Sequence, residues 1–273
     1  MKFIKKLIKK LQKKRQPDHF TPYYNKLNKY HLFSNFKFIK DVKLKIITSF
    51  DENYNEIGKF TTATMSNYAK KYNFEFESIP MDVTGRPQSW NKINLIQNEI
   101  KKNKNDYIMW IDADAFFSNE AENIASVLNE KFEIYLSSHY CGVFKGSIYK
   151  NTILTTQRIN CGVMIFKTSD FSSSFLQKVW DYEKYINHTW YEQAAIMDLV
   201  GLKADISRNL NDNIGNNYYL KKIKFLNKEW NSIPSFSEIS TESIRPSIIH
   251  LAGMSNIDRL GFLTDYAKRG KIL

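Results

Sequence analysis

Apolar and polar positions alternate with two different periods between residues 43 and 137. The predicted order is strand 43–50, helix 57–73, strand 74–79, helix 90–102, strand 107–111, helix 120–129 and strand 132–137. Strands that alternate with helices in this way pack as a mainly parallel sheet with helices on both faces. The pattern therefore predicts an α/β fold of three layers, with ligands bound at the carboxyl ends of the strands.

The second half of the chain is patterned less regularly. It predicts a long loop at 139–158, a strand at 161–167, helices at 171–186 and 190–200, strands at 223–226 and 247–251, and a helix at 257–268. We expect so long a loop to be ordered around a ligand or an acceptor. No internal repeat or convincing linker divides residues 43–273, so we expect them to form one domain.

A different pattern precedes that domain. Five apolar residues recur at helical spacing, with lysines on the opposite face: Phe3, Ile4, Leu7, Ile8 and Leu11. Residues 1–16 are therefore predicted to form a basic amphipathic helix, and 17–42 a connector. Such a helix can lie on an anionic membrane surface, and we expect residues 1–15 to do so. A solvated tail, or a helix packed against protein, remains the alternative.

The charge of the chain is concentrated in the same segment. The formal net charge is +12, and residues 1–15 hold eight of the 40 basic residues and no acid. Without them, 32 basic residues face 28 acidic ones, so the body is only mildly basic and does not predict binding to nucleic acid. Two cysteines make no disulfide framework. With no apolar run long enough to span a bilayer and no secretory signal, we expect a cytoplasmic protein, peripheral on the inner membrane face.

Two carboxylates follow the apolar strand predicted at 107–111. Asp112 and Asp114 are separated only by Ala113, and side chains at i and i+2 of an extended segment point the same way. At a strand end they can share one divalent cation, and oxygen ligands suit magnesium or manganese. An ordinary acidic turn after a core strand is the alternative, so the prediction depends on the rest of the chain.

Four further segments accompany this Asp-x-Asp. They are Trp90-Asn91-Lys92, Asn160-Cys161-Gly162-Val163, Trp190-Tyr191-Glu192-Gln193 and His250-Leu251-Ala252-Gly253. In this order, residues 43 to about 260 resemble glycosyltransferase family 34, nucleotide-sugar glycosyltransferases with the GT-A (Rossmann-like) fold. The chain departs from that family in having Cys161 in the Asn-x-Gly segment and in lacking the luminal membrane anchor of the eukaryotic members.

The resemblance implies a reaction and a metal. The reaction would be sugar transfer from a nucleoside-diphosphate-sugar, with a UDP-sugar favoured, to a hydroxyl of a glycan or lipid-linked glycan. It further implies retention of anomeric configuration and a Mn²⁺ or Mg²⁺ cofactor. Asp114 is the first metal ligand, His250 closes the metal site, and Asp112 shares the metal or binds the donor.

The remaining candidates are assigned to the donor, the sugar and the acceptor. For the donor we expect Lys92 and Arg259 near the diphosphate, together with Thr48, Ser49, Asp82, Arg86, Trp90, Ala113 and Gly253. For sugar and acceptor we expect Asn160, Gly162, Trp190 and Tyr191, with Glu192, Gln193 and Lys92 as the catalytic group. The identity of a nucleophile stays open. A solvated charge, a strand-end cap or core packing is the ordinary alternative for each of these residues.

Other functional classes fit the sequence less well. A phosphatase of the haloacid-dehalogenase type places its Asp-x-Asp at the first strand, whereas several elements precede Asp112 here. No Gly-x-Gly-x-x-Gly follows a strand, and paired Cys or His spacing for zinc is absent. The remaining alternative is an inactive, membrane-associated GT-A-like scaffold that binds nucleotide sugar or glycan without turnover.

Overall fold

The computed structural model describes residues 39, 41–81, 84–144, 153–202, 204, 218–234 and 245–272, without the side chains of 138–144 and 153–158. The predicted helix at 1–16, most of the connector at 17–42 and Asp82 lie outside the described residues. Among the residues that are described, no helix has the length and apolar character needed to cross a membrane.

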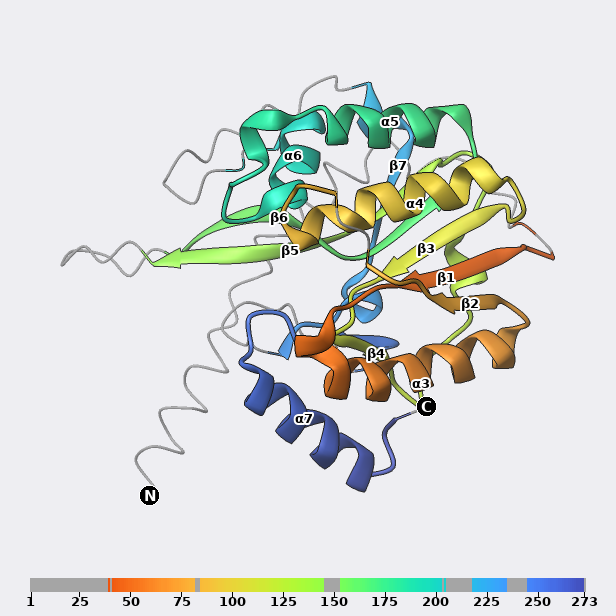
Figure 1. Ribbon diagram of the computed structural model, residues 1–273, viewed down its shortest axis with the longest axis vertical. Coiled ribbons are helices and arrows are strands. Elements are labelled where there is room, and N and C mark those ends of the chain that lie inside the picture. The colour runs from red at the N-terminus through yellow and green to blue at the C-terminus, as the bar shows by residue number, and fades with distance from the viewer. Residues whose placement is uncertain are drawn as a thin grey trace. The chain divides into compact units, whose positions relative to one another are not determined.

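A six-stranded sheet forms the centre of the domain (Figure 1). Its strands, in spatial order, are β2 (Glu75–Ser78), β1 (Leu44–Thr48), β3 (Tyr107–Ile111), β6 (Ile153–Lys167), β5 (Ile134–Phe144) and β7 (Ile223–Leu226). β1 is parallel to both β2 and β3, and β5 is parallel to β7. β6 runs antiparallel to β3 and β5. The sheet is thus mainly parallel, as predicted, with β6 as the reversed strand.

Helices cover the sheet in two layers. Figure 1 shows α4 (Asn91–Lys102) and α5 (Asp170–Trp180) on one side of the sheet, and α3 (Asn55–Tyr72) on the other. α6 (Tyr191–Leu199) packs against β6 and α5, and α7 (Asn256–Lys268) packs against α3. A second, two-stranded sheet pairs β4 (Ala115–Phe117) antiparallel with β8 (Ile248–His250). These elements confirm the predicted three-layer α/β class.

The central strands are buried because most of their residues are apolar and helices cover both faces of the sheet. All five residues of β1 and all five of β3 are buried, as expected for strands covered by helices on each side. Below the sheet, the ring of Tyr68 in α3 stacks on Phe117 of β4 with ring centroids 3.6 Å apart. Both strands end at the same edge of the sheet, so the loops that follow them meet there.

Two sequence predictions were wrong in this region. The helix predicted at 120–129 is only a 3-10 turn at Ile124–Val127. The Tyr68 hydroxyl accepts a hydrogen bond from the Ile124 amide and donates one to the Glu122 carbonyl, so tertiary contacts set the backbone there. The loop predicted at 139–158 is, in its described parts, a long pairing of β5 with β6. Its run of β-branched residues after 153 favours a strand.

A third element is shorter than predicted. α5 ends at Trp180, whereas the helical pattern was extended to residue 186. A 3-10 turn at Glu183–Tyr185 follows α5, which explains why the helix-like spacing of apolar residues continues.

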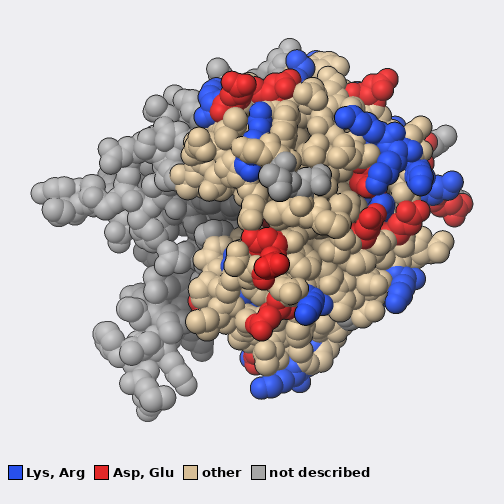
Figure 2. Space-filling model, in the orientation of Figure 1, with Lys and Arg blue, Asp and Glu red and all other residues tan. Residues whose placement is uncertain are grey.

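Acidic and basic side chains are interspersed on the surface of the domain that Figure 2 shows. Basic side chains gather over the C-terminal end of α4.

Candidate active site

A cavity of about 540 Å³ opens at the carboxyl ends of β1 and β3. Its lining comes from the loops after these strands and from the beginnings of α4 and α6. β6, β8 and the first turn of α7 complete it. The Asp-x-Asp, the Trp-x-Lys, the Asn-x-Gly, the Glu-Gln and the His-x-Ala-Gly segments all contribute to this lining. Folding therefore brings together all five sequence motifs at one place.

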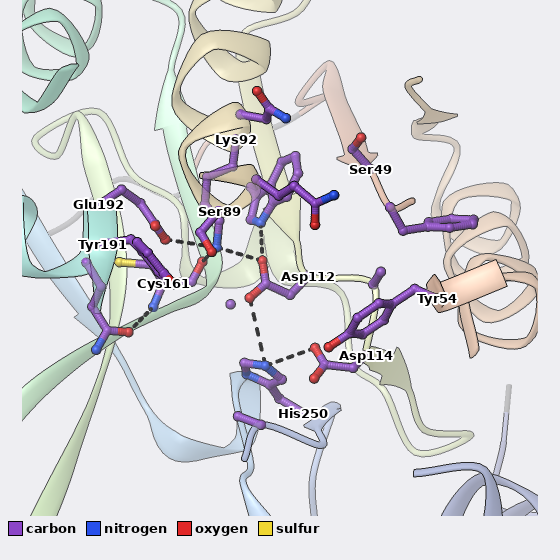
Figure 3. Close-up of a pocket in the computed structure, with 18 of the residues that line it drawn as sticks. Ser49, Tyr54, Ser89, Lys92, Asp112, Asp114, Cys161, Tyr191, Glu192 and His250 are labelled. Atoms are coloured by element: carbon purple, nitrogen blue, oxygen red, sulfur yellow. Dashed lines mark hydrogen bonds and ion pairs between the residues drawn. The ribbon is translucent and has the colours of Figure 1, made fainter. Parts of the chain in front are cut away.

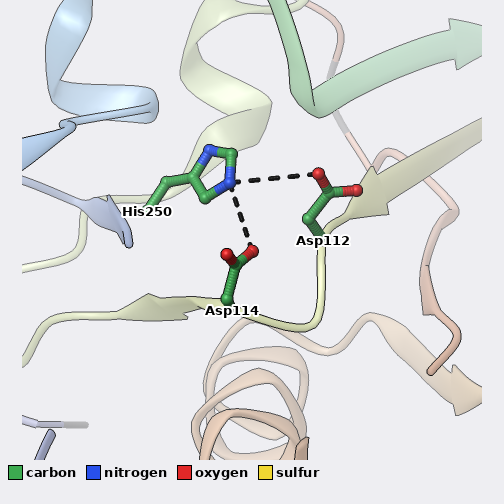
Figure 4. Close-up of side chains that lie close together, drawn as sticks. All are labelled: Asp112, Asp114 and His250. Carbon is green, nitrogen blue, oxygen red and sulfur yellow. Dashed lines mark ion pairs between the residues drawn. The ribbon is translucent and has the colours of Figure 1, made fainter. Parts of the chain in front are cut away.

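Asp112, Asp114 and His250 lie together at the floor of this cavity (Figure 4). One ligand atom from each lies within 4.8 Å of the others. Nε2 of His250 is 3.2 Å from Oδ1 of Asp114 and 3.9 Å from Oδ2 of Asp112. Ala115 pairs with His250 in the β4–β8 sheet, so a tight turn after β3 and one short strand pair bring the three side chains together.

These three side chains suit a divalent cation. In an octahedral site with bonds of about 2.1 Å, adjacent ligand atoms are about 3 Å apart and opposite ones about 4 Å apart. The two distances from Nε2 fall in that range. Two carboxylates and one imidazole are a donor set that manganese accepts readily and that magnesium tolerates. The residues present therefore fit the metal that the sequence predicted.

Lys92 lies between two carboxylates (Figure 3). Its ammonium group is 2.8 Å from Oδ1 of Asp112 and 3.1 Å from Oε1 of Glu192. Burial lowers the pKa of Lys92, but the negative charges of Asp112 and Glu192 outweigh that effect and raise it, so the lysine is charged. The Trp110 indole also donates to Oδ1 of Asp112, at 2.6 Å. Oδ1 is thus fully engaged, and Oδ2 is the oxygen that faces His250.

Arg259 performs the corresponding role for Asp114. Its guanidinium lies 2.9 Å from Oδ2 of Asp114, and it also donates to the Leu251 carbonyl and the Asn256 side chain. Burial would raise the pKa of Asp114, but His250 and Arg259 outweigh burial and lower it to about 2. Arg259 lines the cavity, and the carboxylate that it pairs with there is Asp114.

Glu192 and Gln193 line the wall of the cavity at the start of α6, and Glu192 lies beside Lys92. Glu192 is buried, and its Oε2 has no hydrogen-bond partner in the described part of the chain. Burial raises the pKa of Glu192, Lys92 lowers it and Asp112 raises it further, with a net increase. The side-chain oxygen of Gln193 accepts a bond from the Cys161 amide, at 3.3 Å. A carboxylate with an unused oxygen is therefore available beside the cavity.

The four residues predicted to bind sugar or acceptor all line the cavity: Asn160, Gly162, Trp190 and Tyr191. Oδ1 of Asn160 accepts a bond from the Gly162 amide, at 2.9 Å. A side chain at Gly162 would collide with the imidazole of His250, so glycine is required there by the metal site. Tyr191 has a φ of 44°, a strained conformation for a residue with a side chain, at the beginning of α6.

The predicted donor-binding residues separate into two groups. Ser49, Lys92, Ala113, Gly253 and Arg259 line the cavity, and Gly253 uses a φ of 77° that favours glycine. Thr48, Arg86 and Trp90 are described but are not part of the lining, and Asp82 lies outside the described residues. Thr48 and Trp90 are fully buried.

Arg86 is occupied by packing. Its guanidinium lies 4.9 Å from the ring centroid of Trp90 and 4.1 Å from that of Trp180, and it donates to the Trp180 carbonyl. The Trp90 indole donates to the Ile186 carbonyl, at 3.2 Å. Arg86 and Trp90 therefore hold the beginning of α4 against the end of α5, and a direct contact with the donor requires them to move.

Several residues of the site were not identified from the sequence. Tyr54, Asp51 and Asn91 line the cavity, Trp110 donates to Asp112, and Asn231 contacts His250 from behind. Trp110 and Asn91 lie within or beside the Asp-x-Asp and Trp-x-Lys motifs, so the sequence could have indicated both residues. Asn231 lies in no motif, and its role depends on a contact with a distant strand.

The fold and this site define a glycosyltransferase of the GT-A class. Residues 45–253 match the model of the galactosyl transferase GMA12/MNN10 family, and the chain belongs to that family. Among curated proteins, no sequence matches it significantly.

A solved structure shows the same fold at low identity, and a second one resembles the chain more weakly. The glycosyltransferase involved in glycosylation of the major capsid of PBCV-1 is 14% identical, with a TM-score of 0.57, and the match covers 82% of this chain and 99% of that one. The galactosyltransferase LgtC, solved with donor and acceptor sugar analogues, is 10% identical with a TM-score of 0.46, covering 82% and 95%.

Proposed function

We propose that this glycosyltransferase is metal-dependent and retaining, and that it transfers a sugar from a nucleoside-diphosphate-sugar, with a UDP-sugar favoured, to a hydroxyl of a glycan or lipid-linked glycan. The observation that carries the proposal is the arrangement of Asp112, Asp114 and His250 on the floor of a cavity with Glu192 and Gln193 on its wall. A metal-binding end and a sugar-facing end are what a diphosphate-sugar donor requires.

The floor of the cavity would hold the diphosphate. Asp112, Asp114 and His250 would hold Mn²⁺ or Mg²⁺, which supplies Lewis-acid stabilisation of the departing diphosphate. Lys92 pairs with Asp112 and adds a positive charge beside the diphosphate. Arg259 pairs with Asp114 and helps to lower the pKa of that carboxyl. The chain thus supplies two cations beside the metal-binding carboxylates.

The wall of the cavity would hold the transferred sugar. In the reaction, the bond from the anomeric carbon to the diphosphate oxygen breaks with its electron pair, and the acceptor hydroxyl oxygen bonds to that carbon and gives up its proton. Retention requires attack on the face the diphosphate leaves, or a double displacement through a nucleophile on the other face. The unpartnered Oε2 of Glu192 and the amide of Gln193 would bind or stabilise this centre. Proton NMR of the product's anomeric centre measures the stereochemistry, and an inverted product would contradict retention.

The acceptor would lie against Trp190 and Tyr191, which line the cavity. Aromatic faces beside polar groups suit a sugar ring, which has apolar C–H faces and hydroxyl edges. Asn160 lines the same cavity and accepts a hydrogen bond from the Gly162 amide. The chemistry of the site therefore favours a carbohydrate acceptor.

The proposal is tested by donor hydrolysis with UDP-, GDP- and CDP-sugars in the presence of Mn²⁺. We expect UDP-sugars to be hydrolysed fastest, and Asp114→Asn to lose at least about a hundredfold in rate, because it removes a charge that holds the metal. Asp265→Asn is the matched control, since Asp265 pairs with Arg269 on the exposed face of α7. Full activity of Asp114→Asn, or of wild type in excess chelator, would contradict metal dependence. Donor binding without any turnover would favour the scaffold.

A further inference from the structure

Behind His250, on the side away from the two aspartates, lies the buried side chain of Asn231. Its Oδ1 is 3.0 Å from Nδ1 of His250. The neighbouring residue Ser232 pairs with β8: its amide donates to the Ile248 carbonyl, and its carbonyl accepts from the His250 amide. Backbone pairing therefore fixes Asn231 beside the imidazole, even though its own segment forms no motif.

The orientation of the Asn231 amide follows from a chain of hydrogen bonds. Oδ1 of Asn160 accepts from the Gly162 amide and from Nδ2 of Asn231, each at 2.9 Å. The Gly162 amide can only donate, so the atom of Asn160 that faces it must be the oxygen. Asn231 must then direct its NH₂ group to that oxygen and its own oxygen to His250.

This orientation requires a proton on Nδ1 of His250. The carboxamide oxygen of Asn231 accepts hydrogen bonds and cannot donate them, so Nδ1–H must be the donor. Nε2 is the nitrogen directed at Asp112 and Asp114. Without a metal, the Asp114 carboxylate at 3.2 Å favours a proton on Nε2 as well. A metal would take the place of that proton, and Nε2 is in the right place to bind it.

Gly162 restricts the ring from a further direction. A methyl group at this position would collide with Cε1 and Nδ1 of His250. The Asn160-Cys161-Gly162 segment therefore acts twice on the histidine, through the absence of a side chain at Gly162 and through Oδ1 of Asn160, which orients Asn231.

We propose that Asn231 is a positioning residue for His250, which accepts a hydrogen bond from Nδ1–H and so directs Nε2 toward Asp112 and Asp114. Asn160 sets the orientation of Asn231, so part of the Asn-x-Gly motif serves the metal site as well as the sugar. The consequence for metal affinity rests on the metal-dependent function proposed above, whereas the hydrogen bond from Nδ1–H to Asn231 does not.

The test uses full-length, ¹⁵N-labelled protein without metal at pH 9. Long-range ¹H–¹⁵N correlation spectra report which ring nitrogen is protonated, and the His250 signals are assigned by their loss in His250→Gln. We expect a proton on Nδ1 in wild type and its loss in Asn231→Leu, where only the carboxylates remain as acceptors and hold the proton on Nε2. Asn231→Asp retains an acceptor for Nδ1, so we expect it to keep Nδ1 protonated. Asn227→Leu, an exposed change four residues earlier, is the control.

Calorimetric titration with Mn²⁺ measures the consequence. We expect Asn231→Leu to raise the Kd about tenfold to a hundredfold, as other changes behind metal-binding histidines do. A proton that stays on Nδ1 in Asn231→Leu, or an Nδ1 without a proton in wild type, would overturn the inference. Absence of Mn²⁺ binding by wild type would instead overturn the metal in the proposed function, and the spectra would still decide the role of Asn231.

Discussion

Two carboxylates, Asp112 and Glu192, share the ammonium group of Lys92. One positive charge cannot neutralise both, and the unpartnered Oε2 of Glu192 shows where the imbalance remains. A buried carboxylate of this kind costs stability, and such groups are typical of sites where a charge serves a reaction. Glu192 therefore lowers the stability of the fold, and its place in the site indicates a functional role.

The pH dependence of stability tests this interpretation. Because the pKa of Glu192 is raised above its ordinary value of 4.5, the folded state holds this proton more tightly than the unfolded state. Its stabilising effect is complete below that value and is lost as the pH rises through the folded pKa. Glu192→Gln removes this loss, so we expect the variant to gain stability relative to wild type as the pH rises toward 8.

Denaturant unfolding of both proteins between pH 4 and 8 measures the difference. Glu130→Gln, which changes an exposed glutamate, should follow wild type at every pH. We expect Glu192→Gln also to lose at least about a hundredfold in transfer rate, since it removes a charge beside the reacting sugar. A variant that is less stable than wild type at pH 8 would show that the pair with Lys92 outweighs the burial of the carboxylate.

The residues of the site lie at the ends of helices and strands. The amino-terminal turns of α4 and α6 bring Lys92 and Glu192 to the cavity, and the carboxyl end of β3 brings Asp112. The reversed strand β6 carries Asn160 and Gly162 past the same edge, because its residue Val163 pairs with Ile111 of β3. The position of α4 relative to α5 therefore matters for the site, and Arg86 is the side chain packed between their tryptophans.

Arg86→Met tests whether Arg86 joins elements or binds the donor. Loss of its stacking between Trp90 and Trp180, and of its bond to the Trp180 carbonyl, should lower the free energy of unfolding by about 1–2 kcal/mol. We expect the KM for the donor to change less than twofold. Lys178→Met, on the exposed side of α5, is the control. A raised KM with unchanged stability would return Arg86 to the donor site.

In the whole molecule, charge is distributed unevenly between the basic N-terminal segment and the catalytic domain. The catalytic domain carries mixed charge, and the strong positive charge belongs to residues 1–15. An amphipathic segment with eight basic residues would bring the enzyme to an anionic membrane, where a lipid-linked acceptor would be concentrated. We propose this as the reason for the charge distribution.

Flotation with liposomes tests the membrane proposal. Removing residues 1–15 should reduce binding to phosphatidylserine-containing vesicles more than tenfold, because each basic residue near the surface contributes about 1 kcal/mol. Binding of the intact chain should weaken in high salt and on neutral vesicles. Donor hydrolysis in solution should not change. Equal binding with and without these residues would contradict the proposal.

The local pattern of the chain was enough to predict the α/β class, the positions of most strands and helices, and the motif residues at the strand and helix ends. This is possible because periodicity and turn chemistry are short-range properties. The same patterns misled at 120–129, where the Tyr68 hydroxyl sets the backbone, and at 139–158, where β5 and β6 pair instead of forming a loop.

Tertiary structure alone decided how the motifs act on one another. It reversed β6, set Ala115 opposite His250, and paired Lys92 with two carboxylates. It also turned Arg86 toward two tryptophans and placed Asn231 behind the histidine. Each of these depends on contacts between segments far apart in the chain. Which side chains meet there is set by packing and strand pairing, and no local period encodes it.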